Sequence, residues 1–359
     1  MKILIVKLGS IGDIVHTLPS LAAIRRAWPQ AEVAWVVERR AAEILKDNPL
    51  LDRLIEIDTK ALRRWRPLSG ETLLATRQQL QRLRASAFDV ALDFQGLLKS
   101  AAIARLARAP RVYGFARHML REPASRFLLT QTVNVPQDIN VIRKNLALTA
   151  GALGIGVPAD GDDFEFPIAV SPEHEREASD AAAAVGGRFA ILNAGGGWPT
   201  KLWSADRFGA LADALLARHN LRSLVTYGPG ERELAESVAR ASRTGAARPV
   251  SLSLKGFYSL AGRASLYVGG DTGPTHLAVA AGAPIVGLFG PTEWWRNGSP
   301  RAADVCVERT DIGCRTGCHR RSCSAWVCMD IEVARVAAAA DERLRRVAGS
   351  ERAEALTIA

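Results

Sequence analysis

The chain has 359 residues, of which 48% are hydrophobic and 23% are charged. At roughly 150 residues per domain, this length predicts two domains, and the composition excludes both a single small module and a disordered chain. The longest apolar runs fall far short of the roughly 20 residues that cross a bilayer, and the first residues lack the apolar region and cleavage site of a signal peptide. We therefore expect a cytoplasmic protein.

The net charge is +10, from 47 basic and 37 acidic residues. A basic protein attracts nucleic acids, anionic membrane surfaces, or phosphorylated and carboxylated substrates. Nucleic-acid binding is the weakest of these readings, because the chain carries no recognition motif and its basic residues are scattered. We expect no nucleic-acid partner.

Aliphatic segments alternate with helical patterns from the first residues onward. Residues 2–6 form an aliphatic run, which a glycine turn over 9–13 and a helical pattern through Ile24 follow. Continuous apolar character is typical of strands that are buried on both faces of a parallel sheet. The alternation predicts an α/β fold with two doubly wound parallel-sheet domains. Seven further segments have strand character: 33–37, 90–92, 111–114, 190–193, 223–227, 266–269 and 285–289.

Turn-forming and acidic residues interrupt the helical period over 156–172, which marks the domain boundary. We expect an N-terminal domain over 1–168 and a C-terminal domain over 169–330, whose first helix spans 173–184. An Ala/Arg/Glu-rich helix over 331–347 and a frayed tail complete the chain as a C-terminal segment over 331–359.

Residues 267–276 run from a strand through a turn rich in glycine and threonine into an Ala-rich helix. Such a turn offers backbone N–H groups and a positive dipole end to a phosphate. It can equally be an ordinary strand-to-helix turn in which Asp271 or Thr272 caps the helix and His276 is packed inside.

Two charged residues follow strands of the second half. Lys201 comes after the turn at 195–199, on the rim where α/β sheets bind ligands, and can neutralise a diphosphate there; the alternative is a solvated loop lysine. Glu231 follows a Gly-Pro-Gly turn and can accept hydrogen bonds from ribose hydroxyls, or merely start a helix.

Asp13 stands where the first strand's turn becomes a helix. It can be an N-cap, or a general base at the carboxyl edge of the sheet. The helix dipole would keep Asp13 ionised and make it a weak base, able to assist only a proton that leaves late in the reaction. Basic residues also cluster in this half, and they can form either a solvent-exposed charged surface or a binding site for an acidic partner. They are Lys60, Arg63, Arg64, Arg66, Lys99, Arg117, Arg121 and Arg126.

Residues 3–19 (ILIVKLGSIGDIVHTLP), together with 93–100, 201–203, 270–277 and 286–292, resemble glycosyltransferase family 9, the lipopolysaccharide heptosyltransferases. Segments 62–66 and 121–127 resemble the branch that adds the first heptose. The resemblance implies a GT-B fold, in which two Rossmann-like domains face a central cleft. It implies that ADP-heptose binds the C-terminal domain and that the acceptor, Kdo–lipid A, binds the N-terminal domain. It further implies inverting transfer without a metal or other cofactor. We also expect exposed apolar residues near Trp65 to make peripheral contact with the cytoplasmic face of the inner membrane, where the lipid tails of the acceptor stay.

The resemblance also implies residue roles. Asp13 is the base on the Kdo hydroxyl, and Lys201 stabilises the departing ADP. The alternatives are another family member, such as the one that adds the second core heptose, and a non-catalytic nucleotide-binding GT-B protein. The implied donor-binding residues are Gly195, Gly196, Lys201, Glu231, Asp271, Thr272, Gly273 and His276. The implied acceptor-binding residues are Lys7, Ser10, Arg63, Arg64, Arg66, Gln95, Lys99 and Arg121.

Four of the five cysteines cluster as C-x3-C-x4-C-x4-C, at Cys314, Cys318, Cys323 and Cys328, with His319 alongside. This segment looks more like the second-step and other branches of the family. The spacing lacks the two-residue knuckle of common zinc sites. A structural metal, a redox-labile pair and free thiols all remain open readings.

Overall fold

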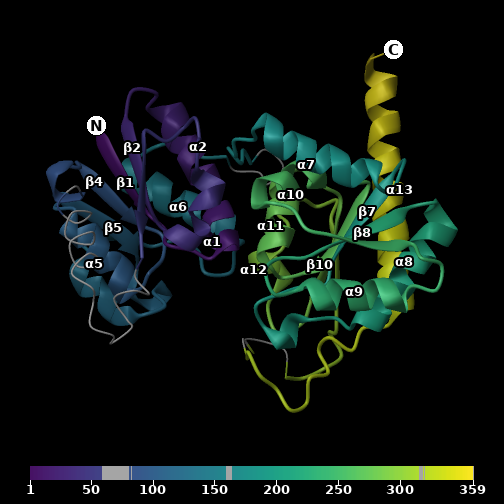
Figure 1. Cartoon of the computed structure of the whole chain (residues 1–359). Helices are drawn as coiled ribbons and strands as arrows, with labels where there is room; N and C mark the ends of the chain where they lie inside the picture. The colour runs from purple at the N-terminus through teal and green to yellow at the C-terminus, as the bar shows by residue number, and fades with distance from the viewer. Residues whose placement is uncertain (59–80, 82, 159–163, 315–317, 319, 359) are drawn as a thin grey trace, which may run out of the picture. The chain divides into compact units, whose positions relative to one another are not determined.

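The structure, a computed structural model, describes residues 1–58, 81, 83–158, 164–314, 318 and 320–358. The chain divides into two compact units, Met1–Ala169 and Val170–Ala359. Each unit is a parallel sheet with helices on both faces (Figure 1).

The described part of the first unit has a six-stranded sheet in the order β3-β2-β1-β4-β5-β6, with every neighbouring pair parallel. The central strand β1 is aliphatic because both of its faces are covered, and Ile3, Leu4, Ile5 and Val6 are fully buried. The strands are β1 (Lys2–Val6), β2 (Glu32–Glu38), β3 (Arg53–Ile57), β4 (Val90–Asp93), β5 (Arg111–Phe115) and β6 (Gln131–Val133).

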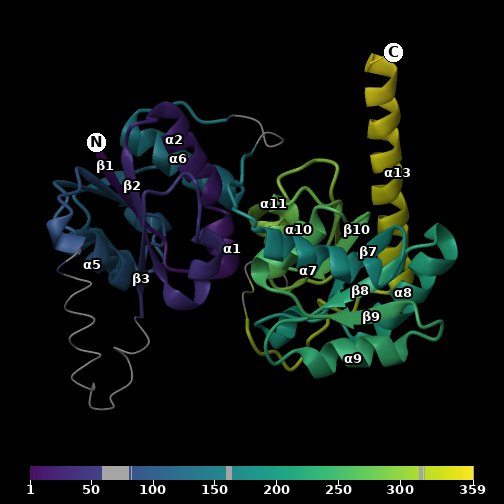
Figure 2. The ribbon, with the colours of Figure 1, turned by 45° about the horizontal axis from the view of Figure 1, so that its top comes forward.

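Helices of the first unit follow the strand order. Two helices connect β1 to β2, a third connects β4 to β5 on the other face, and the last returns to pack beside the second (Figure 2). Phe164 and Phe166 pack with Ile142 and Leu146 of that last helix, which ties the end of this unit to its own core. The helices are α1 (Ile11–Val15), α2 (Leu18–Ala27), α5 (Leu98–Leu106) and α6 (Val141–Leu153), with 3₁₀ turns η1 (Arg39–Leu45), η2 (Arg117–Met119) and η3 (Pro123–Leu128).

The second unit repeats this arrangement. Its described strands form a six-stranded parallel sheet in the order β12-β11-β10-β7-β8-β9, so the first and fourth strands of the unit are again neighbours. The strands are β7 (Phe189–Asn193), β8 (Arg222–Thr226), β9 (Ala247–Val250), β10 (Leu266–Gly270), β11 (Ile285–Phe289) and β12 (Val305–Glu308).

The helices of the second unit form two layers. One layer holds α7 (Pro172–Ala183), α10 (Leu254–Ala261) and α11 (Gly273–Ala280), and the other holds α8 (Ala205–His219), α9 (Arg232–Ala241) and α13 (Val333–Ile358). The short helices η5 (Pro199–Lys201) and α12 (Trp294–Asn297) lie in loops. Helix α13 continues to Ile358, so the expected end at 347 and frayed tail are wrong for the backbone (Figure 1). Helix-forming Ala, Glu and Leu residues continue there.

The expected fold class, α/β with two doubly wound parallel sheets, is confirmed. In both sheets the chain reverses its winding direction between the first and fourth strands, at β1/β4 and β7/β10. Ligands of such sheets bind at the carboxyl ends of the strands beside this switch point. Within the described ranges, no helix is both long and apolar enough to span a membrane.

Candidate active site

Asp13 lies at the switch point of the first sheet. Ser10 takes the N-cap of α1, so Asp13 is not the cap but the third helical residue, and its carboxylate accepts a hydrogen bond from the Ser10 N–H at 3.0 Å. The Lys7 ammonium lies 3.3 Å from the same carboxylate. Burial raises the pKa of Asp13, but the Lys7 charge and the Ser10 N–H outweigh it, so the pKa lies below its usual value. Asp13 is therefore an ionised carboxylate with 35% of its side chain exposed.

Lys7 also joins two turns at this edge. Its buried ammonium donates to the carbonyl oxygen of Phe94 at 2.9 Å, and the N–H of Leu8 donates to the side-chain oxygen of Gln95 at 3.1 Å. These bonds hold the turn after β4 against the turn after β1. The expected contacts of Lys7 and Gln95 with an acceptor stay predictions, and for Lys7 the geometry favours an action through Asp13.

Asp93, at the end of β4, is a buried titratable residue at the same edge of the sheet, and the sequence alone assigns it no role. Its fully buried carboxylate accepts hydrogen bonds from the N–H groups of Gln95 (2.9 Å) and Gly96 (3.4 Å) and from the Ser100 hydroxyl (3.0 Å). Burial raises the pKa of Asp93 to about 6, because these bonds and the Lys7 charge offset only part of the desolvation. The sequence signal was an acidic residue at a strand end directly before a Gln-Gly turn.

Basic side chains of the first unit gather near the same turn. The Lys99 ammonium lies 3.1 Å from Glu38, a buried carboxylate at the end of β2. The exposed Arg121 sits beside Gly96, because the N–H of Glu122 donates to the Gly96 carbonyl at 3.1 Å. The predicted acceptor contacts Arg63, Arg64 and Arg66 lie outside the described residues.

Lys201, Asp271 and His276 form an ionic cluster at the switch point of the second sheet. The Lys201 ammonium lies 2.6 Å from one Asp271 carboxylate oxygen and donates to the Asp271 carbonyl at 3.1 Å. His276 Nε2 is 3.2 Å from the other carboxylate oxygen, and Asn297 donates to the first at 3.3 Å. Burial raises the pKa of Asp271, but His276 and Lys201 outweigh it and hold the pKa far below its usual range. Asp271 thus fixes the two other groups in place.

Lys201 is also held by an aromatic ring. Its ammonium lies 4.4 Å from the centroid of Trp198, and 13% of its side chain is exposed. A lysine whose position is set by a carboxylate, a carbonyl and a ring presents its charge with little loss of conformational entropy on binding.

Glu231 and the glycine turn after β7 meet at the neighbouring strand end. Glu231 starts α9 from the N-cap, and its carboxylate accepts from the Gly228 N–H at 2.9 Å, so the helix-start reading is correct for the backbone. A Cβ at Gly195 would lie 2.4 Å from that carboxylate, and one at Gly196 would lie 3.0 Å from Thr272. Glycine at 195 is therefore what admits the Glu231 carboxylate to this turn.

The N-terminus of α11 faces the same edge. Thr272 is the N-cap residue and Gly273 is the first helical residue. The Thr272 hydroxyl bonds to the side chains of Asn193 (3.4 Å) and Thr275 (3.3 Å) and does not cap a backbone N–H of the first helical turn, which leaves these N–H groups to a ligand. The structure thus brings together all the predicted donor-binding residues at the carboxyl ends of β7, β8 and β10.

Comparisons with known proteins agree with this arrangement. The family model of glycosyltransferase family 9 (heptosyltransferase) matches residues 76–343. Lipopolysaccharide heptosyltransferase 1 of Pseudomonas aeruginosa is 32% identical over 326 residues, which are 90% of this chain and 88% of that protein.

Two solved structures share the fold. E. coli heptosyltransferase WaaC with ADP has a TM-score of 0.73 at 26% identity, covering 86% of this chain and 93% of that one. The same enzyme with ADP-2-deoxy-2-fluoro heptose has a TM-score of 0.71 at 25% identity, with the same coverage of 86% and 93%. On the family match and the relative's identity over most of both chains, the protein belongs to glycosyltransferase family 9 and is a glycosyltransferase.

Proposed function

We propose that this protein transfers L-glycero-D-manno-heptose from ADP-heptose to a Kdo hydroxyl of Kdo–lipid A, with inversion and without a catalytic metal, in synthesis of the lipopolysaccharide inner core. The observation that carries the proposal is the complementary chemistry of the two switch points. One presents an ionised, partly exposed carboxylate at Asp13, and the other presents a held cation at Lys201 beside a helix N-terminus.

Asp13 is the base. Its carboxylate takes the proton of the Kdo hydroxyl while that oxygen forms its bond to the anomeric carbon of heptose. Because its pKa is lowered, Asp13 is unprotonated at neutral pH and accepts the proton only as the hydroxyl becomes strongly acidic late in the transfer. Lys7 keeps the carboxylate ionised and oriented.

The second switch point receives the leaving group. As the bond between the anomeric carbon and the diphosphate oxygen breaks, charge develops on ADP, and Lys201 and the N-terminus of α11 stabilise it. In transfer without a metal, such preorganised groups stabilise the negative charge of the diphosphate, which a divalent cation would otherwise stabilise. Glu231, at the end of the neighbouring strand, can accept hydrogen bonds from the ribose hydroxyls of a nucleotide. ADP is the nucleotide in the solved WaaC structure, which supports it as the nucleotide here.

The acceptor side is basic and carries an exposed aromatic residue. Arg121 and Lys99 suit the carboxylates of Kdo and the phosphates of lipid A. Phe127, in the segment 121–127, has 82% of its side chain exposed. We propose that this segment contacts the cytoplasmic face of the inner membrane, where the protein acts as a peripheral enzyme; the contact expected near Trp65 lies outside the described residues.

An acceptor comparison tests the proposal. Purified protein is incubated with ADP-heptose and either Kdo–lipid A or its mono-heptosylated form, and ADP release and product mass are measured. We expect turnover on Kdo–lipid A alone, the opposite anomeric configuration in product and donor, and no acceleration by added Mg²⁺ or Mn²⁺. Turnover only on the heptosylated acceptor assigns the second core heptose instead. ADP binding without ADP release on either acceptor assigns a nucleotide-binding protein.

A further inference from the structure

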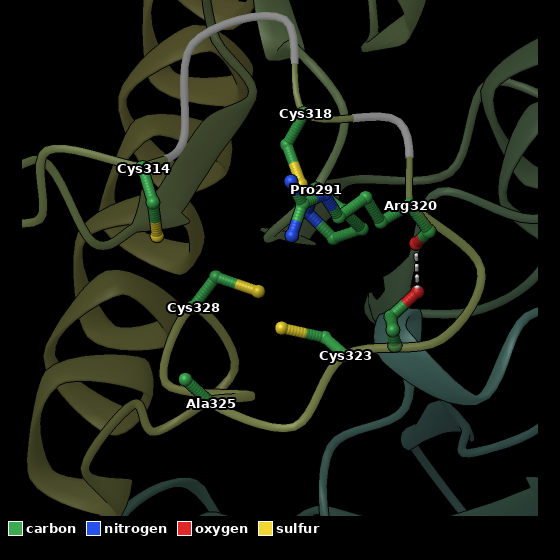
Figure 3. A pocket seen from close by; sticks show the side chains of 8 residues that line it. Pro291, Cys314, Cys318, Arg320, Cys323, Ala325 and Cys328 are labelled. Carbon is green, nitrogen blue, oxygen red and sulfur yellow. Dashed lines mark hydrogen bonds between the residues drawn. The ribbon is translucent and has the colours of Figure 1, made fainter.

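Four cysteines converge on one pocket of the second unit. Cys314, Cys318, Cys323 and Cys328 line it together with Thr200 and Arg320, and their sulfur atoms point into a common space (Figure 3). All five cysteines of the chain are described and none forms a disulfide. The fifth, Cys306, lies on β12 and donates to the Glu308 carboxylate at 3.4 Å, away from the pocket lining.

The chain segment that carries the four thiols has little else to hold it. Between the end of β12 and the start of α13, its described residues include no helix or strand. Within 311–327, no described residue is buried, and only Ile312 and Cys318 are half-buried. A loop of this length without secondary structure or a core is unusual in a compact domain. A cross-link or a bound ion is the ordinary way to order such a segment.

The thiols have the chemistry of a metal site. Four cysteines on one pocket supply the ligand types of the four-sulfur sites of structural zinc and of iron–sulfur proteins. Residues 309–328 contain four arginines and one aspartate, and this net positive charge offsets part of the negative charge of four metal-bound thiolates.

The four thiols line one pocket without forming a closed ligand set. Among the described residues, no three His, Cys, Asp or Glu side chains already stand at ligand distance from one point. Rotation about the Cα–Cβ bond moves each sulfur between staggered positions, and all four already face the pocket. His319 lies outside the described residues and is not needed to complete four ligands.

We propose that Cys314, Cys318, Cys323 and Cys328 bind one soft transition-metal ion, Zn²⁺ or iron, as four thiolates, with release of their protons. The ion takes no part in the transfer reaction.

The role of this ion is to position the loop before Lys201. The Thr200 hydroxyl donates to the carbonyl of Arg320 at 2.7 Å, and the Trp326 indole N–H donates to the carbonyl of Thr200 at 2.9 Å. The Arg321 guanidinium lies 5.0 Å from the centroid of Trp198, the ring that also contacts Lys201. The cysteine segment therefore contacts Thr200, which precedes Lys201 in the chain, and Trp198, whose ring contacts the Lys201 ammonium.

Metal analysis of the full-length protein tests the proposal without reference to the transfer reaction. The protein is purified without chelators, and its zinc and iron are measured by mass spectrometry. We expect about one ion per chain, and visible absorption of tetrahedral cobalt–thiolate after exchange with Co²⁺. Cys323→Ser, at an exposed position, should lose at least ten-fold of the metal content, and the matched control Cys306→Ser should keep it.

Three outcomes overturn the proposal. One is a metal content far below one ion per chain, without cobalt–thiolate absorption after addition of Co²⁺. Another is a thiol count two short of five that reductant restores, which assigns a redox pair. The third is equal metal in Cys323→Ser and Cys306→Ser, which places the ion elsewhere. Circular dichroism of each variant confirms that it folds.

A second measurement tests the positioning role. Removal of the ion should change the fluorescence of Trp198 and Trp326 and weaken ADP binding several-fold. Metal bound in full stoichiometry whose removal leaves both signals unchanged would contradict the role assigned to it. Because neither signal requires turnover, failure here is separate from failure of the proposed transferase reaction.

Discussion

The carboxylate of Glu231 packs directly on the backbone of Gly195, so closely that a Cβ at residue 195 would lie 2.4 Å from its oxygen. The two residues follow the adjacent strands β7 and β8. Their contact cannot be recognised from the sequence, where they are far apart. Glycine is required at 195 because of what the neighbouring strand presents there.

Gly195→Ala should displace the Glu231 carboxylate without unfolding the protein, because the end of a flexible side chain can move away. We expect KM for ADP-heptose to rise by about 10- to 100-fold, the value of one or two hydrogen bonds to a charged group, with kcat less affected. Gly197→Ala is the matched control, since a Cβ there meets nothing within 4 Å. Steady-state kinetics with both variants decide, and equal KM values would remove Glu231 from the donor site.

Asp13→Asn should fold normally and lose about 100-fold or more in kcat, the scale of one general base, while ADP affinity is retained. Lys7→Met should move the acidic limb of the pH–rate profile to higher pH, because loss of the ammonium raises the pKa of Asp13. The pH dependence of kcat measured on wild type and Lys7→Met checks this shift. Near-normal turnover by Asp13→Asn would exclude it as the base.

Asp271→Asn should weaken the hold on Lys201 and His276 and reduce kcat by about 100-fold through misplacement of the lysine. ADP affinity should fall in the same variant, with KM for the acceptor unchanged. Asp330→Asn, which removes a surface partner of Arg207 in the same unit, is the control. If both variants bind ADP like wild type, Asp271 has no positioning role.

Asp93 should make stability depend on pH between about 4 and 6. Its folded-state pKa is raised to about 6, so the folded protein binds the proton more tightly than the unfolded chain does. The protonated carboxyl therefore stabilises the fold at low pH, and this part of the free energy of unfolding is lost as pH rises through 6. The loss corresponds to roughly 3 kcal/mol for a pKa raised by about two pH units.

Asp93→Asn removes this titration, and an amide can still accept from the Gln95 N–H and donate to Ser100. We expect the variant to be at least as stable as wild type at pH 7 and to lose that advantage by pH 4. Urea unfolding at several pH values measures the difference, with the exposed Asp89→Asn as the control for net charge. If the free energies of unfolding of wild type and variant differ by the same amount at every pH tested, Asp93 does not have a raised pKa.

Phe127→Ser should reduce binding to vesicles that contain anionic lipid by several-fold, because partial burial of a phenyl ring in the interface contributes up to about 2 kcal/mol. Trp295→Ser, an exposed aromatic position of the second unit, should bind vesicles like wild type. Sedimentation with vesicles at low and moderate salt compares the two. Equal loss in both variants would contradict a specific contact at Phe127.

The sequence predicted the eight interior strands of the two sheets and missed the four that lie at the edges, β3, β6, β9 and β12. An interior strand is covered on both faces and must be a continuous apolar run, which a reader of the sequence can recognise. An edge strand has one neighbour and is largely half-exposed, so β9 can contain Pro249 and β12 can end in the charged residue Glu308.

The turns that carry the candidate site residues could also be predicted from local sequence pattern. Parallel strands place the turns after them at one edge, so Asp13, Lys201 and the Asp271–His276 turn could be assigned to the carboxyl ends of strands from local pattern alone. Their residue types indicated an acid–base group and a diphosphate grip before any contact was known.

The partners of those residues could not be read in this way. Lys7 with Asp13, Lys201 with Asp271, and Glu231 with Gly195 depend on which strands are neighbours, and strand order follows from packing of helices between them rather than from local propensity. The raised pKa of Asp93 and the convergence of four cysteines on Thr200 likewise arise from burial and from loops that meet only in the folded chain. The sequence determines residue types and local structure, whereas burial of a charged group and contacts between distant segments arise only when the chain folds.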